Sequence, residues 1–314
     1  MNTRVSLIEL DREQSTLLRG LGILMVLLGH IGCVPYGGAS GVAIFLVQSG
    51  YGLNASCSDR GLAGYWGKRL RKVYLPYLTI GVFDVLALRV KGLGPVLCTL
   101  LGLDLNLIAD KTMWYVSYIL VWYLLYYLAA LLTRGVRKPL LREAGKLAFL
   151  LPCAYGLMRL YHLGFWHAAS AANFYVLAFP LGVLLSDLRG LKVSERARSC
   201  LWFGVLLLST AWLFGLYPFR ENSLIMPNAV AVQAIAVLQL CRPRRRIGAL
   251  LRWFGTYSYA IYLVEGLILT VRYTWFAPLG QPVLIELAFL AVSALCGALF
   301  WNCYRRLEAA LFDR

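Results

Sequence analysis

The chain has 314 residues, of which 60% are hydrophobic, and its mean hydropathy is +0.67. Soluble domains are usually about 45–50% apolar, so this composition excludes an ordinary soluble protein and predicts an integral membrane protein. The formal net charge of +16 would suggest nucleic acid in a soluble protein. Here, however, Lys and Arg stand in short connections between apolar segments, and no nucleic-acid-binding module accompanies them. We therefore expect membrane lipid as a partner and no nucleic acid.

Apolar segments of about 18–20 residues recur along the chain, and each is long enough to cross a hydrocarbon core of about 30 Å. They predict an all-α, polytopic fold with about ten transmembrane helices, in a single domain over residues 1–314. In chain order, the predicted crossings are residues 17–34, 40–56, 73–90, 113–132, 147–162, 172–187, 200–217, 224–241, 256–276 and 283–304.

One further apolar segment, 94–108, is short and is interrupted by Gly94, Pro95 and Gly102. If it does not cross, the connections on the inner side hold most of the 31 Lys and Arg residues, as the positive-inside rule requires. We therefore predict that 94–108 is re-entrant or interfacial, with its backbone shielded by protein. Both termini are then cytoplasmic, in a plasma (inner) membrane.

Two ionisable residues, Arg19 and His30, lie eleven positions apart in the first predicted helix. That spacing returns to within about 20° of the same helix face, about 16 Å further along the axis. Ionisable side chains inside spans usually face the bundle interior or a cavity. Arg19 also fits snorkelling to the interface. His30 fits either a structural hydrogen bond or proton transfer, because an imidazole has a pKa near 6.5.

The other polar residues within predicted spans include Asp84, Arg159, Gln233 and Glu265. Asp84 and Glu265 fall in the outer halves of their helices, as His30 does. A carboxylate there would orient the imidazole and stabilise its charged form. An Asp84–Arg159 structural pair accounts for those two residues equally well. The eight cysteines form no CxxC pair, so we expect buried thiols and no metal site.

A basic run, Lys68-Arg69-Leu70-Arg71-Lys72, precedes Pro76 in a predicted inner loop. One interpretation is that these positive charges set the membrane topology or contact lipid headgroups. The other is a clamp for a phosphorylated ligand, since arginine binds phosphate through two parallel hydrogen bonds. For the second cluster, Arg244 to Arg246, charge that sets topology is the favoured interpretation.

In pattern and order, these motifs resemble the acyltransferase type 3 family, membrane proteins that modify sugars and other cell-envelope hydroxyls. The family opens with Arg and, eleven residues later, His at the end of the first helix. A Gly-rich stretch to Ser-Gly-Tyr, a basic R-x-x-R-like loop before proline, a Trp at a helix start and a late Ser-Tyr-x-Ile-Tyr-Leu follow. The matching residues are Arg19 and His30, Gly37 to Tyr51, Arg69 to Lys72, Trp114, and Ser258 to Leu263. Many members carry His after the last motif, where this chain has Glu265.

The resemblance implies an O-acetyltransferase that moves an acyl group, in the first instance acetyl from acetyl-CoA, to a hydroxyl of a carbohydrate or polysaccharide precursor of the cell envelope. His30 is then the general base, and Glu265 orients it. Arg19 positions the donor or stabilises developing negative charge. The CoA phosphates are held by Arg69, Arg71 and Lys72. An acyl-histidine relay across the membrane is equally compatible with these residues.

Five residues are candidates for substrate contact, although helix packing through small and aromatic side chains explains most of them as well. They are Asp84, Ser49, Tyr51, Trp114 and Ser258. A different class of function also fits the buried charges, namely a transporter or flippase-like carrier of a small polar solute or envelope intermediate. No inverted repeat supports that class, and CoA binding would separate the two. A membrane anchor or sensor without activity is a third interpretation.

Overall fold

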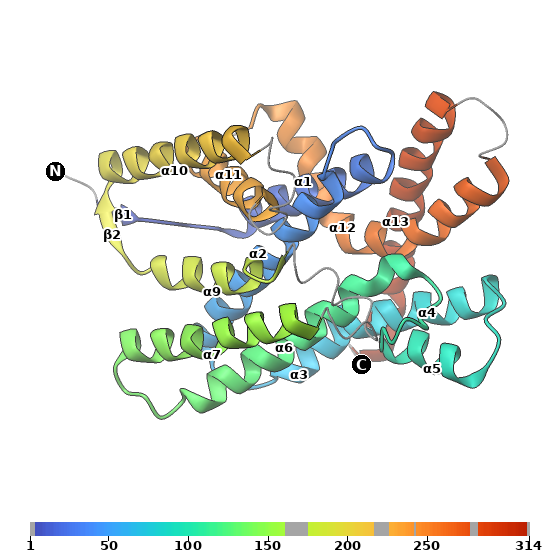
Figure 1. Cartoon of the computed structure of the whole chain (residues 1–314), viewed down its shortest axis with the longest axis horizontal. Helices are drawn as coiled ribbons and strands as arrows, with labels where there is room; N and C mark the ends of the chain where they lie inside the picture. The colour runs from blue at the N-terminus through green and yellow to red at the C-terminus, as the bar shows by residue number, and fades with distance from the viewer. Residues whose placement is uncertain (1–3, 161–174, 217–225, 242, 277–281, 313–314) are drawn as a thin grey trace. The chain divides into compact units, whose positions relative to one another are not determined.

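The computed structural model describes residues 4–160, 175–216, 226–241, 243–276 and 282–312 (Figure 1). The described residues confirm the all-α class, with one small sheet added to it. The helices are α1 (Arg12–His30), α2 (Gly37–Arg60), α3 (Tyr65–Arg69), α4 (Leu75–Ala87), α5 (Leu93–Leu101), α6 (Trp114–Leu132), α7 (Pro139–Leu160), α9 (Ala178–Leu188), α10 (Glu195–Leu216), α11 (Met226–Leu240), α12 (Arg245–Val271) and α13 (Pro282–Phe312). Three short turns complete them: η1 (Leu70–Tyr74) and η4 (Arg272–Phe276), which are π-helical, and the 3₁₀ turn η2 (Lys111–Met113).

A helix lies at each of the ten predicted crossings, but the helices differ in length. Among the described residues, four are long and apolar enough to cross a membrane: Lys111–Leu132, Glu195–Gly215, Arg245–Thr274 and Val283–Phe312. Two more, Ala178–Leu188 and Met226–Leu240, are apolar but shorter. The structure thus describes a membrane protein, and the number of ten crossings stays a prediction.

By its internal contacts, the chain divides into two compact units. Unit 1 comprises residues 1–63, 119–164 and 169–255, and unit 2 comprises residues 64–118, 165–168 and 256–314. The division falls within α6 and α12, so their first and last turns belong to different units. The two units are described separately below.

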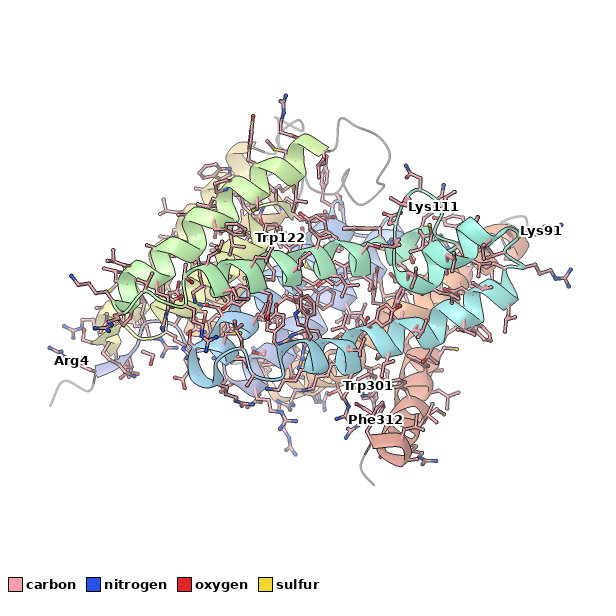
Figure 2. The ribbon with its side chains drawn as sticks, turned by 90° about the horizontal axis from the view of Figure 1, so that it is seen from below. Arg4, Lys91, Lys111, Trp122, Trp301 and Phe312 are labelled. Carbon is pink, nitrogen blue, oxygen red and sulfur yellow. The ribbon has the colours of Figure 1, made fainter. Side chains whose placement is uncertain are left out.

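Unit 1 is organised around α2, which packs against α1 on one side and α9 on another. Trp122, labelled in Figure 2, stacks on Phe179 with ring centroids 5.1 Å apart. Figure 1 shows α10 lying alongside α11, with two short strands at the start of α10. These strands, β1 (Arg4–Ser6) and β2 (Lys192–Ser194), pair antiparallel. The pairing requires both segments to lie on the same side of a membrane, as do the six crossings predicted between them.

In unit 2, α3, η1 and α4 follow one another without a break, and α5 packs against α4. Two tyrosine hydroxyls on the first helical run hold α5: Tyr74 donates to the Leu100 carbonyl at 3.0 Å and Tyr77 to the Thr99 carbonyl at 2.5 Å. With nine residues, α5 is about 14 Å long, far short of a hydrocarbon core of about 30 Å. This length agrees with the prediction that 94–108 does not cross.

Candidate functional site

His30 is the last residue of α1, where two pairs of glycines bring α1 and α2 together. A side chain at Gly41 would come within 2.3 Å of the Gly22 carbonyl oxygen, and one at Gly29 within 2.2 Å of the Gly38 amide nitrogen. Only glycine allows such close backbone contact, a device common between membrane helices. The Gly-rich stretch noted in the sequence therefore fixes the end of α1, and His30 with it. The His30 side chain is half-buried there.

Arg19 lies one helical turn after Thr16 on α1 and donates to its hydroxyl at 3.0 Å. The residue is exposed in the chain. Whether Arg19 snorkels to the interface or acts on the donor stays a prediction. Arg19 and His30 both belong to unit 1 and to one continuous helix.

The basic run, predicted as a loop, is helical throughout, which corrects the sequence-based prediction. Arg69 ends α3, and Arg71 and Lys72 lie in the π-helical turn η1. Leu, Arg and Lys are good helix formers, so the charges do not interrupt the helix. Such single π-helical turns are frequent at functional sites.

The backbone of η1 lacks one donor because of Pro76, which has no N–H group. In a π-helical turn, the nitrogen of residue 76 would pair with the carbonyl of Arg71 five residues earlier. The Tyr304 hydroxyl of α13 donates to that carbonyl instead, at 3.1 Å. The Tyr259 hydroxyl of α12 donates to the Val73 carbonyl at 2.7 Å. Tyrosines from α12 and α13 thus hold residues 69–74, called the basic turn below, in place.

The three predicted phosphate-binding cations have different surroundings. The Arg69 guanidinium lies over the Tyr65 ring, 5.6 Å from its centroid. Arg71 lies 3.8 Å from Glu308, measured from Nε to Oε1, and its guanidinium carbon is 4.4 Å from the centroid of the Phe312 ring. Lys72 is exposed. The structure brings the three cations onto one helical run, but it already supplies Arg71 with a carboxylate.

Glu265 is completely buried in α12, next to a glycine that makes room for a second carboxylate. A side chain at Gly266 would come within 2.0 Å of Asp110 Oδ2. Asp110 Oδ1 accepts from the backbone nitrogen of Thr112 at 2.8 Å and from its hydroxyl at 2.7 Å. The Tyr262 hydroxyl donates to the Thr112 carbonyl at 2.5 Å. The late Tyr-x-x-Tyr-Leu motif therefore binds α12 to two segments, the basic turn and residues 110–112.

Asp84 on α4 is also completely buried, and Asp104 and Asp110 are nearly so. Sequence analysis singled out Asp84 and Glu265 but gave no role to Asp110. The signal for Asp110 was available in the sequence, because an aspartate two residues before a threonine is a common turn and helix cap. Among the described residues, no group of three or more His, Cys, Asp or Glu side chains is arranged to hold a metal ion.

The remaining substrate candidates have structural contacts. The Tyr51 hydroxyl accepts from the Leu10 amide at 3.3 Å and so holds the N-terminal segment on α2. Trp114 contacts the rings of Tyr115 and Tyr118. Ser258 is buried, and Ser49 is half-buried. For Tyr51 and Trp114, these contacts agree with the helix-packing interpretation.

Unit 1 contains a buried polar network that no pattern in the sequence indicates. Lys146 of α7 donates to Asn54 Oδ1 at 2.6 Å and forms an ion pair with Glu143. Tyr126 donates to the same Asn54 oxygen at 2.8 Å, and the Asn54 amide donates to Asp187 at 2.5 Å. Burial raises the pKa of Glu143, but hydrogen bonds, first of all from Lys146, outweigh it and hold the pKa below its usual value. The network joins α2, α6, α7 and α9.

The predicted site residues fall into both units. Arg19, His30, Ser49 and Tyr51 belong to unit 1, whereas the three cations, Asp84, Trp114, Ser258 and Glu265 belong to unit 2. The orientation of His30 by Glu265 and the pairing of Asp84 with Arg159 therefore stay predictions.

The acyltransferase type 3 family model, described as an acyltransferase domain, matches residues 12–302, a range that contains every predicted site residue. No curated protein and no solved structure matches the chain.

Proposed function

We propose that this chain, which belongs to the acyltransferase type 3 family and is therefore a membrane acyltransferase, transfers acetyl groups from acetyl-CoA to a hydroxyl of a carbohydrate precursor of the cell envelope. The observation that carries the donor assignment is the basic turn. It presents Arg69, Arg71 and Lys72 on one helical run whose backbone is fixed by Tyr259 and Tyr304. Charge-assisted hydrogen bonds from such cations suit the phosphates of CoA.

In the proposed reaction, the acceptor oxygen attacks the thioester carbonyl carbon while His30 removes the hydroxyl proton. The new C–O ester bond forms, the C–S bond breaks, and the CoA thiolate leaves and takes up a proton. General-base catalysis of this kind contributes about 10²–10⁴-fold in rate. Arg19, about 16 Å from His30 along α1, positions the donor. A relay through an acetylated His30 would use the same residue as nucleophile.

The proposed location is the plasma membrane, with the basic turn and both termini on the cytoplasmic side, where CoA is found. The distribution of Lys and Arg supports this orientation. The pairing of β1 with β2 supports an even number of crossings between residues 4–6 and 192–194, because it requires both segments to lie on one side.

Transfer of label from acetyl-CoA tests the proposal. Membranes of the source cells that contain the full chain are given radiolabelled acetyl-CoA, and label in the envelope carbohydrate is measured. His30→Ala should lose activity about 10²–10⁴-fold, while Cys33→Ser, an exposed change just beyond α1, should keep it. Full activity in His30→Ala would refute the assignment of His30 as the base. No transfer by the wild type would refute the proposed identity of the donor or of the acceptor.

A transport function is the second candidate, because Asp84 and Glu265 are completely buried and buried carboxylates also line translocation paths. Binding of CoA separates the two, since a solute carrier has no reason to recognise it. Stabilisation of the purified protein by a small polar solute, with none by CoA, would favour transport.

A further inference from the structure

Three residues at the end of α13 form a stripe that contacts a single arginine of the basic turn. Tyr304, Glu308 and Phe312 are four residues apart, so successive members are offset by only about 40° around the helix. The Tyr304 hydroxyl bonds to the Arg71 carbonyl, Glu308 faces the Arg71 Nε at 3.8 Å, and the Phe312 ring lies 4.4 Å from the guanidinium carbon. Phe312 is labelled at the end of α13 in Figure 2. All four residues belong to unit 2.

The three contacts have different strengths. Tyr304 is buried and bonds to the backbone, so it fixes the turn itself. The two side chains of the ion pair are partly exposed, 41% for Arg71 and 27% for Glu308, although the Arg71 Nε atom itself is buried. Ion pairs at such exposure contribute little and exchange readily with other ions. The Glu308 contact is therefore the one that a ligand can replace.

Guanidinium geometry allows that exchange without moving Arg71. The guanidinium carbon of Arg71 lies over the face of the Phe312 ring. Carboxylates and phosphates bind a guanidinium along its edges, where the N–H donors lie. Glu308 lies on the Nε edge of Arg71. A phosphate that binds this edge competes with the carboxylate, because two anions cannot approach it together without repulsion.

We propose that the Tyr304–Glu308–Phe312 stripe gates the donor site. Glu308 occupies the edge of Arg71 until a phosphate of the nucleotide thioester displaces it, and Phe312 keeps the guanidinium plane in place during the exchange. This proposal rests on the proposed binding of CoA at the basic turn. The stripe lies beyond residues 12–302, which the family model matches, so the gate is argued from the contacts of this chain alone.

Ligand titrations of the detergent-purified full-length protein test the gate. The probes are CoA and, separately, inorganic pyrophosphate, and thermal stabilisation gives the dissociation constant. Glu308→Gln should bind both about two- to five-fold more tightly, which is the range expected when an exposed competing ion pair is removed. Glu195→Gln makes the same charge change at an exposed position in unit 1 and should leave the constants unchanged.

The same change in an Arg71→Ala background should give no gain, because the competition needs the guanidinium. Glu308→Asp, which keeps the charge on a shorter side chain, should give a smaller gain than Glu308→Gln. If the wild type binds CoA and Glu308→Gln binds it equally or more weakly, the gate is refuted and the donor proposal stands. If CoA binds neither the wild type nor Glu308→Gln, but Glu308→Gln binds pyrophosphate more tightly than the wild type does, the proposal that CoA is the donor is refuted and the gate stands. No stabilisation of any variant by either probe refutes both.

Discussion

Lys146 in unit 1 and Arg71 in unit 2 each face a glutamate, yet 5% of the Lys146 side chain is exposed and 41% of the Arg71 side chain. Lys146 is enclosed by Glu143 and by Asn54, which Tyr126 also holds. Arg71 has its backbone fixed by Tyr304 while its side chain meets Glu308 at the surface. A buried cation must keep all its partners, because an unpaired charge in a low dielectric is costly. A cation with an exposed side chain can exchange one anionic partner for another. We therefore propose that the Lys146 network stabilises the fold and that the Arg71–Glu308 pair takes part in ligand exchange.

Removing the enclosed cation gives the largest expected effect. Lys146→Met removes the buried cation between Asn54 and Glu143 and leaves Glu143 paired with the more exposed Arg142. It should lower the free energy of unfolding by about 3–5 kcal/mol. Arg142→Gln is the matched control, because Arg142 also contacts Glu143 but its side chain is 39% exposed. It should cost less than about 1 kcal/mol. Unfolding in SDS titrations measures both, and equal losses would remove the distinction between the two arrangements.

Tyr304→Phe tests the contact that fixes the Arg71 backbone. It removes the hydrogen bond to the Arg71 carbonyl and should cost about 0.5–1.5 kcal/mol of stability. CoA binding should also weaken, because the turn loses a positioning contact. Tyr155→Phe, at an exposed tyrosine of α7, is the control for loss of a hydroxyl. If Tyr304→Phe lowers stability but leaves the CoA dissociation constant unchanged, the tyrosine supports the fold and not the site.

The smallest effect is expected at a third ion pair, which is exposed on unit 1. Arg189 donates to Asp59 at 2.5 Å, and this hydrogen bond lowers the pKa of the Asp59 carboxyl below its usual value. A lowered folded-state pKa means that the pair stabilises the protein above about pH 4 and that this contribution is lost as the pH falls through the lowered pKa. The difference in unfolding midpoint between wild type and Asp59→Asn should therefore be largest at pH 6 and smaller at pH 3. An equal difference at both pH values would contradict the assignment.

The sequence predicted the helices well and their ends less well. A described helix lies at each of the ten apolar segments, and four described helices are long and apolar enough to cross a membrane. Apolar length placed the end of the last helix at residue 304, whereas α13 continues to Phe312, since helix formation does not stop where polarity begins. The strands β1 and β2 have three residues each, too few for an alternating pattern to be read.

The site was predicted in part for similar reasons. Arg19, His30 and the basic run are local patterns, so spacing alone reveals them. Asn54 and Lys146 are 92 residues apart, and Arg71 and Tyr304 are 233 residues apart. No local pattern joins such residues, and only the packing of the helices shows that they meet. The network around Lys146 and the contacts of Arg71 therefore came from the structure.

The measurement that tests the central claim most directly is the thermal stability of the detergent-purified protein with increasing acetyl-CoA. Wild type is measured beside the Arg69→Ala/Lys72→Ala double variant, with Arg305→Ala/Arg306→Ala, two exposed cations of α13, as the control for lost charge. A ligand at 100 times its dissociation constant stabilises by about 2.7 kcal/mol. We predict a saturable shift in wild type and control that is absent from the Arg69/Lys72 variant. An equal shift in all three proteins, or none in wild type, would contradict donor binding at the basic turn.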